Sequence, residues 1–202
     1  MTAVVRAGYR ALLDNASGVN FVAEADSGEV GCRAYVEHHP DIVIMDLSLP
    51  GISGFEATRR IIARDSGARI LAFSMHEDTA FVEQALQAGA RGYISKSIAP
   101  TVLLEAARQI ATGNIYLEPE IAQRLAFKKT RGPSSPFTEL STREFEMFCL
   151  LAEGLNAAKI GKRLSLSSKT IANYATQIKN KLEVSSIAEI ARLAIRHGIV
   201  DA

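Results

Sequence analysis

Apolar and polar positions along the first 117 residues follow two different repeats. Short, nearly continuous apolar runs alternate with stretches in which apolar positions recur every three to four residues, and these patterns are typical of strands and amphipathic helices respectively. The predicted strands are 19–25, 41–46, 68–74 and 91–95. The predicted helices are 3–14, 28–38, 54–64, 79–88 and 101–112. This alternation predicts a parallel sheet whose strands are joined by right-handed helical crossovers.

In the runs D-I-V-I-M-D (41–46) and A-R-I-L-A-F-S (68–74), the residues that would face either side of the sheet are mostly apolar. A strand with this pattern is covered on both faces, as in α/β proteins. The helices between the strands end at residues that stop helices, such as Gly89 and Gly113. The fold class predicted for this part is therefore α/β with a buried parallel sheet.

The chain changes character after residue 117. A short helix is predicted over 118–126, and the segment K-K-T-R-G-P-S-S-P-F-T (128–138) has the composition of a linker. From Leu140 onward no strand pattern remains. We therefore divide the chain into a first domain (1–117), a helix and linker (118–138) and an all-α domain (139–202).

Capping signals divide the last part into four short helices. The words S-T-R-E and S-I-A-E are capping boxes that open the first and the fourth helix, and Asn156 can cap the second. The third helix is predicted over 169–183, after a tight turn at 165–168. Two short helices joined by such a turn predict a helix-turn-helix.

Composition narrows the class of protein. Apolar residues make up 48% and charged residues 22% of the chain, as expected for a globular protein with a real core. No apolar stretch approaches the roughly 20 residues of a membrane span, and no secretory signal is evident, so we expect a cytoplasmic protein without a membrane partner. Cys32 and Cys149 lack metal-ligand spacing, and we expect buried free thiols rather than a disulfide.

The net charge of +1 conceals an asymmetry. Residues 1–127 carry 11 basic and 15 acidic side chains, whereas residues 128–202 carry 12 basic and 7 acidic ones. An acidic first part and a basic second part indicate that only the second meets a polyanion such as DNA.

Polar side chains follow three of the predicted strands at the end where chemistry gathers in open parallel sheets. Asp46 ends one strand, Ser74 ends the next along the chain, and Lys96 follows a third. The loop after Asp46, L-S-L-P-G-I-S-G (47–54), contains the proline and glycines that let the backbone turn sharply beside the carboxylate. These residues predict an acidic site at this edge of the sheet.

The set formed by D-x-x-x-P-G-x-x-G from Asp46, together with Ser74, Tyr93 and Lys96, resembles the receiver domains of response regulators over residues 3–115. The resemblance implies a flavodoxin-like parallel sheet in which Asp46 accepts a phosphoryl group from a histidine kinase or a small phosphodonor. It implies that Lys96 and Ser74 pair with phosphate oxygens, and that Tyr93 acts as a switch residue that turns inward when Ser74 moves toward the phosphate.

The chain departs from the receiver pattern at its start. Receivers begin with an apolar strand that ends in two acidic residues, and these hold Mg²⁺ together with the phosphoacceptor. This chain begins M-T-A-V-V-R-A-G-Y-R, similar to the helix that follows that strand. Of the family's metal ligands only Asp46 is left, which puts the Mg²⁺ expected from the family in doubt.

The missing strand would lie inside the sheet, between the strands at 19–25 and 41–46, and its loss would leave backbone groups unpaired. Three explanations stay open: a true start upstream of Met1, a degenerate receiver with a rearranged sheet, or a partner that fills the gap. Glu24 and Asp26 match no ligand position of the family and are not candidates for the metal site.

Residues 140–200 resemble the DNA-binding domain of the LuxR/NarL/FixJ class. The words that carry the resemblance are L-S-x-R-E, L-x-x-E-G, A-A-K-I-G-K-R-L and L-S-x-K-T-I-x-x-Y-x-x-x-I-x-x-K-L. The ending A-I-R-H-G-I-V-D is similar to the GacA/UvrY subgroup. The segment 186–197 resembles the dimerisation helix of the family, which implies a homodimer on DNA.

The helix from Lys169 has an apolar side and a polar side. Ile171, Ile178 and Leu182 fall at helical spacing and are predicted to face the core. The opposite side carries groups that can read base edges in a major groove, namely Lys169, Asn173, Thr176, Gln177 and Asn180.

Residues better placed for phosphate contacts are Lys159, Thr170, Lys179 and Lys181. The base-reading positions of the family correspond to Ala172, Asn173 and Thr176. Many members have Lys where this chain has Ala172, so its sequence preference should differ from theirs.

The sequence is consistent with three functions to different degrees. The first is a two-component response regulator that binds DNA as a transcription regulator and is controlled by phosphorylation of Asp46. The second is a DNA-binding or dimerisation protein that works without phosphorylation. The third is an enzyme that forms an aspartyl phosphate and hydrolyses it. That enzyme needs a general acid two residues after Asp46, where this chain has Ser48, so we expect no enzyme.

Overall fold

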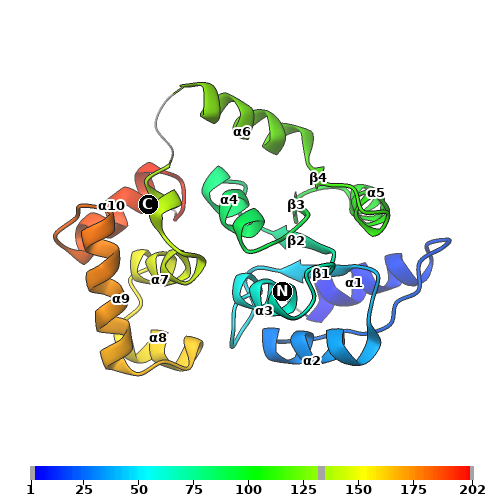
Figure 1. Ribbon diagram of the computed structural model, residues 1–202, viewed down its shortest axis with the longest axis horizontal. Helices are drawn as coiled ribbons and strands as arrows, with labels where there is room; N and C mark the ends of the chain where they lie inside the picture. The colour runs from blue at the N-terminus through cyan, green and yellow to red at the C-terminus, as the bar shows by residue number, and fades with distance from the viewer. Residues whose placement is uncertain (1–2, 132–134, 201–202) are drawn as a thin grey trace. The chain divides into compact units, whose positions relative to one another are not determined.

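The computed structural model describes residues 3–131 and 135–200 (Figure 1). The chain forms two compact units. The first holds the chain up to Met75 together with Ala88–Pro119, and the second holds His76–Gln87 together with the chain from Glu120 onward. Within the described ranges, no helix combines the length and apolar character that a membrane crossing demands.

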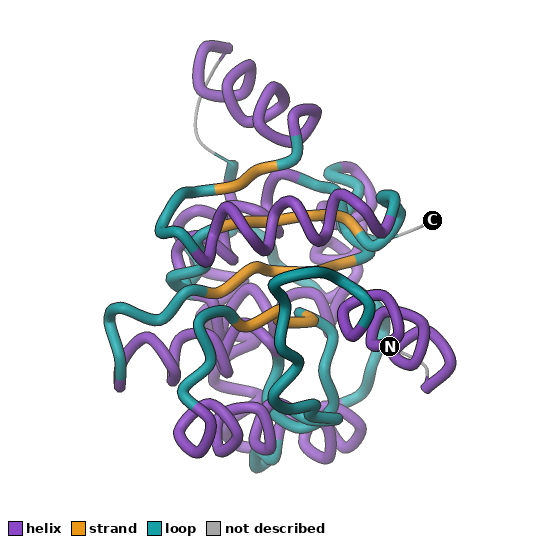
Figure 2. Tube along the Cα trace, turned by 90° about the vertical axis from the view of Figure 1, so that its right-hand side faces the viewer, coloured by secondary structure: helices purple, strands orange, loops and turns teal. Residues whose placement is uncertain are grey.

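The first unit contains a parallel sheet of four strands, which lie side by side in chain order (Figure 2). The strands are β1 (Val43–Asp46), β2 (Ile70–Ser74), β3 (Gly92–Ser95) and β4 (Tyr116–Leu117). The register pairs Asp46 with Phe73 and Ser74 with Ser95. The strands predicted at 41–46, 68–74 and 91–95 are thus confirmed. The two-residue strand β4 is too short to leave a pattern in the sequence.

Helices cover both faces of the sheet (Figure 1). One face carries a core cluster that includes Tyr35 of α2 (Gly28–His38) and Ile61 of α3 (Gly54–Arg64). The other face carries a cluster that includes Leu103 and Ile110 of α5 (Pro100–Ala111), against which Tyr9 of α1 (Ala3–Asp14) packs. Burial on both faces explains the near-continuous apolar runs of β1 and β2.

The strand predicted at 19–25 is wrong. This segment is a loop with exposed or half-buried residues, and Val22 is 44% exposed. In the described part of the chain no strand pairs with the outer side of β1, which is therefore an edge of the sheet. An apolar segment forms a strand only where a neighbour satisfies its backbone groups, and here that neighbour is missing.

The second unit is helical. Its elements are α4 (Thr79–Gln87), α6 (Pro119–Arg131), η1 (Pro136–Glu139), α7 (Thr142–Ala152), α8 (Ala157–Leu164), α9 (Ser168–Lys181) and α10 (Ile187–Arg196). Helix α7 packs against α9 and α10, and α8 packs against α9.

The predicted boundaries hold for most of these helices. The helix predicted over 118–126 continues to Arg131, so the predicted linker begins inside α6. Lys128, Lys129 and Arg131 extend the helix because they are good helix formers, and Gly132 follows them. Residues 132–134 of the predicted linker and residues 201–202 lie outside the described part of the chain.

Capping fixes the starts of the helices that follow residue 140. Ser141 and Glu144 form the predicted capping box of α7, and Asn156 caps α8. The Ser186 hydroxyl caps α10 by accepting from the Glu189 N–H. The Glu189 carboxylate accepts from the Ser185 N–H at 2.7 Å, so the second predicted box closes one residue earlier than expected.

Candidate functional site

The acidic site is a buried ion pair at the carboxyl end of β1. The Lys96 Nζ lies 2.6 Å from the Asp46 Oδ1, and the two side chains are 8% and 7% exposed. The same Oδ1 accepts a hydrogen bond from the Ser48 backbone N–H at 2.9 Å. A carboxylate so buried needs this pairing, because an isolated charge would be expensive to desolvate.

The parallel register brings the other predicted residues to the same edge. The Lys96 backbone N–H donates to the Ser74 carbonyl at 2.7 Å, which joins the ends of β2 and β3. The side chains of Ser74 and Tyr93 are fully buried. Asp46, Ser74 and Lys96 therefore belong to one end of the sheet, as the sequence predicts.

The loop 47–54 folds back onto Asp46. The Gly54 N–H donates to the Leu47 carbonyl at 3.1 Å, and a Cβ on Gly54 would lie 2.1 Å from the Asp46 carbonyl oxygen. Gly51 has a φ of +73°, which a glycine adopts without strain. The two glycines allow the tight approach that closes the loop beside the carboxylate.

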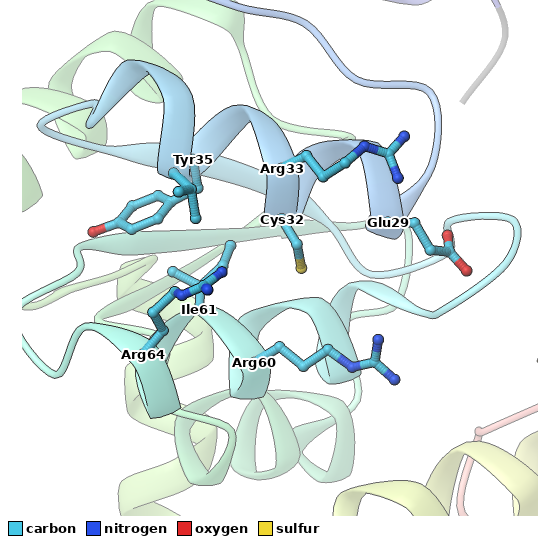
Figure 3. A pocket seen from close by; sticks show the side chains of 8 residues that line it. Glu29, Cys32, Arg33, Tyr35, Arg60, Ile61 and Arg64 are labelled. Atoms are coloured by element: carbon cyan, nitrogen blue, oxygen red, sulfur yellow. The ribbon is translucent and has the colours of Figure 1, made fainter.

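Glu29 is a site residue that the sequence analysis missed. Its Oε1 accepts a hydrogen bond from the Ile52 backbone N–H at 3.0 Å, which fastens the loop after Asp46 to the first turn of α2. Figure 3 shows the Glu29 carboxylate at the rim of the gap between α2 and α3, beside this loop. The two residues are 23 positions apart, and no local pattern links a helix carboxylate to a distant loop amide.

Glu29 also lines a pocket of about 350 Å³ between α2 and α3, with Cys32, Tyr35, Arg60 and four other residues (Figure 3). Burial raises the pKa of the Cys32 thiol, which keeps it neutral and a poor nucleophile. Burial and the Tyr35 hydrogen bond to Asp65, at 2.5 Å, raise the pKa of Tyr35 to about 12. The pocket therefore presents no activated nucleophile.

The donors around Asp46 do not fit a magnesium site. Mg²⁺ prefers nearly octahedral oxygen ligation, usually with carboxylates and water. Among the residues that the structure describes, no group of three or more His, Cys, Asp or Glu side chains could hold a metal ion. The charge that neutralises Asp46 here is the ammonium of Lys96.

The second candidate surface is the polar side of α9. Ile171 and Ile178 are buried, as predicted, and Leu182 is half-buried at the end of the helix. The predicted base-reading side is exposed to solvent at Lys169, Ala172, Asn173, Thr176, Gln177 and Asn180. The Ser167 hydroxyl caps the helix by accepting from the Thr170 N–H at 3.2 Å.

The residues predicted to contact phosphates have different surroundings. Lys159 is exposed on α8, and Lys179 is half-buried on α9. The Thr170 hydroxyl is 2.8 Å from that of Ser167. The Lys181 Nζ lies 2.6 Å from the Glu144 Oε2, and it also donates to a backbone carbonyl of η1.

The Lys181 contact stabilises the fold of the helical unit. Burial alone would raise the pKa of Glu144, but hydrogen bonds from Lys181 and Ser141 outweigh burial and lower it. Because its ammonium is held by α7, Lys181 is the least available of the predicted phosphate contacts.

Two family models match the chain. Residues 2–108 match the response regulator receiver domain, and residues 138–194 match the luxR family of bacterial regulatory proteins. Receiver domains generally bind Mg²⁺ at their phosphorylation site, which contrasts with the donors described around Asp46.

Similar proteins match this chain over most of its length. The transcriptional activator protein ExaE of Pseudomonas putida is 44% identical over 89% of this chain and 85% of its own length. The response regulator GacA of Pseudomonas viridiflava is 38% identical over 98% of this chain and 94% of its own. The solved structure of RcsB from Salmonella enterica serovar Typhimurium, bound to promoter P1flhDC in the presence of phosphomimetic BeF3-, is 26% identical with a TM-score of 0.71. The match covers 95% of this chain and 93% of that one.

Proposed function

The chain belongs to the two-component response regulators with a LuxR-type DNA-binding domain, and on this premise we propose that the phosphorylation state of Asp46 controls its binding to DNA. Members of this family are DNA-binding transcription regulators rather than enzymes. The observation that carries the proposal is the buried contact between Asp46 and Lys96 at the end of the sheet.

Asp46 is the proposed phosphoacceptor. One of its carboxylate oxygens attacks the phosphorus of the donor, the bond from phosphorus to the leaving group breaks, and the leaving group departs with the electron pair. The Lys96 ammonium contacts the Asp46 carboxylate before the transfer, and after it the same ammonium pairs with the phosphoryl oxygens. Ser74 supplies a hydroxyl donor from the end of β2, and Tyr93 is the proposed switch residue.

Helix α9 is the proposed reading element. Asn173 and Thr176 contact base edges in the major groove, and Ala172 replaces the longer side chain of many members. Lys169 and Gln177 extend the same face. The proposed phosphate contacts are Lys159, Thr170 and Lys179, with Lys181 a weaker candidate because Glu144 holds it.

The proposed partners are DNA, a histidine kinase or small phosphodonor, and a second copy of the chain. Ile187 and Ile195 of α10 are 41% and 43% exposed, which supports a homodimer through this helix. A regulator that binds DNA works where the DNA is, so we place the protein in the cytoplasm. We propose the domain boundaries 1–117 and 139–202, joined by 118–138.

A second function is favoured by the surroundings of Asp46. No acidic cluster accompanies this carboxylate in the described part of the chain, and Lys96 already neutralises it. A receiver of this kind can serve in DNA binding or dimerisation without being phosphorylated. In that case the Asp46–Lys96 pair is structural.

Acetyl phosphate labelling distinguishes the two functions. The wild-type chain and Asp46→Ala are incubated with acetyl phosphate, with and without Mg²⁺, and the phosphorylated fraction is measured by gel mobility. Labelling that requires Asp46 and changes DNA affinity supports phosphorylation control. If the wild type stays unlabelled with both acetyl phosphate and a kinase, and Asp46→Ala binds DNA normally, the protein works without phosphorylation.

A further inference from the structure

Helix α4 lies within the range that matches the receiver model, yet it packs with the DNA-binding helices. The Phe81 ring meets the Phe145 ring of α7 edge to face, with centroids 5.1 Å apart and planes at 81°. Both side chains are buried. Phe145 also contacts Phe137 of η1, so Phe81 joins the aromatic core of the helical unit.

Gln84 fastens α4 to the same surface. Its Nε2 donates to the Phe137 carbonyl at 3.1 Å and to the Leu140 carbonyl at 3.0 Å. Gln84 is 1% exposed, so these hydrogen bonds are shielded from solvent. A buried carbonyl left without a donor is destabilising, which makes this amide a strong link between α4 and η1.

The segment before α4 begins at the acidic site. Ser74 ends β2, and His76 follows two residues later with its ring stacked on Phe81, at 4.0 Å between centroids and 3° between planes. Met75, between them, is 67% exposed. Asp78 then caps α4 by accepting from the Ala80 N–H at 2.7 Å. Only Met75 therefore lies between Ser74 and the His76 ring that stacks on Phe81.

The contact on α7 does not involve the reading side of α9. Helix α4 contacts α7 and η1, whereas the base-reading residues of α9, such as Asn173 and Gln177, are exposed. Contact with α4 therefore leaves the DNA-reading residues uncovered. It instead holds α7, which packs against both α9 and α10.

We propose that Phe81 and Gln84 form a docking face on α4 whose partner is η1 and α7 of this chain's own DNA-binding helices, and that Gln84 is the clamp. A movement of Ser74 changes DNA affinity by strengthening or weakening the contact of this docking face with η1 and α7. It does not act by uncovering α9. The inference rests on the proposed function, because it presumes that a change at Asp46 alters DNA binding.

The first test measures coupling in the full-length chain. DNA affinity is compared before and after acetyl phosphate treatment, with a duplex selected by the wild-type chain from a random pool. Gln84→Ala is expected to be labelled on Asp46 as the wild type is, while its affinity change shrinks by at least about threefold. Gln87→Ala, on an exposed glutamine of the same helix, should keep the full change. If Gln84→Ala folds poorly, Gln84→Met keeps the volume without the amide donor.

The second test does not depend on phosphorylation. Amide hydrogen exchange over 136–152 is compared in the wild type, Gln84→Met and Gln87→Ala, and only Gln84→Met should exchange faster in η1. Unchanged exchange in Gln84→Met overturns the clamp, even if Asp46 is labelled. Faster exchange without labelling of the wild type retains the clamp and refutes phosphorylation control. Faster exchange with full coupling in the Gln84 variants overturns the proposed role of the docking face.

Discussion

Individual side chains in this protein take their roles from what surrounds them. Asp46 is a buried carboxylate with the Lys96 ammonium at 2.6 Å, and this pairing in a buried environment distinguishes it from a solvent-exposed aspartate. Glu29 and Glu144 likewise serve the fold, one by holding a loop and the other by closing a capping box onto Lys181. At this scale the important contacts are hydrogen bonds to charged groups, which are stronger than neutral ones.

The Glu29 bond predicts a local effect on the acceptor loop. Glu29→Ala should speed hydrogen exchange of the Ile52 amide by about fivefold, because a net hydrogen bond of roughly 1 kcal/mol is lost. Glu29→Gln keeps an oxygen acceptor and should largely restore protection. NMR exchange measurements test this, with Glu37→Ala on the same helix as the control. Equal Ile52 exchange in Glu29→Ala and the wild type would show that the loop is held by other contacts.

The Glu144–Lys181 pair predicts a pH-dependent contribution to stability. The pKa of Glu144 is lowered below its ordinary value of 4.5, so the pair stabilises the fold above that pH and the stabilisation is lost as the pH falls through the lowered pKa. Lys181→Met should therefore destabilise the protein by about 1 kcal/mol near neutral pH, and by less at acid pH. Urea unfolding at several pH values measures the difference. Lys179→Met is the control, and a destabilisation by Lys181→Met that did not vary with pH would contradict the assignment.

Elements are set by their caps, by their faces and by their neighbours. Ser141, Asn156, Ser167 and Ser186 each accept a backbone N–H at the start of a helix of the DNA-binding part. Helix α9 then buries Ile171 and Ile178 and leaves its polar side exposed. The segment 19–25 shows the opposite case, because its apolar pattern has no strand to pair with in the described sheet.

The two sides of α9 predict two kinds of mutational effect. Asn173→Ala should change which bases are preferred, by about 1–3 kcal/mol at the base pair it contacts. Lys179→Ala should weaken binding to all duplexes and lower the slope of log affinity against log salt by about 0.9. Selection from a random duplex pool and binding at several salt concentrations separate the two effects. An unaltered sequence preference in Asn173→Ala would remove it from the reading residues.

The whole molecule consists of two compact units, and their boundaries differ from those of the two domains predicted from the sequence. Helix α4 belongs by sequence to the receiver range and by contacts to the helical unit. The basic charge is concentrated in the last third of the chain, where the DNA-binding helices lie. Both cysteines are free thiols, as predicted, but both are half-buried rather than buried.

Folding as a whole should protect these thiols. Burial raises the pKa of Cys32 and raises that of Cys149 well above its ordinary value, so little thiolate forms at mildly alkaline pH. Both cysteines should react with a thiol-specific disulfide reagent at least about tenfold more slowly in the native protein than in concentrated guanidinium chloride. Cys32→Ser and Cys149→Ser assign the two phases. Rapid reaction of Cys149 in the native state would be inconsistent with its raised pKa.

The sequence by itself determined those features that depend on local order. Neighbouring residues determine the apolar patterns of β1, β2 and β3, the caps of the DNA-binding helices and the two sides of α9. The structure contains all of these features. Asp46, Ser74 and Lys96 could be grouped because parallel strands end at a common edge. Their roles in phosphoryl transfer stay predictions.

Only the tertiary structure decided which distant groups meet. The loss of the strand at 19–25 depends on a missing neighbour, and the contacts of Glu29 with Ile52 and of Gln84 with η1 join residues 23 and more than 50 positions apart. Each of these contacts joins a side chain to a backbone group, and backbone groups are alike at every residue. The sequence therefore carries no mark of the partner, and the packing of the elements selects it.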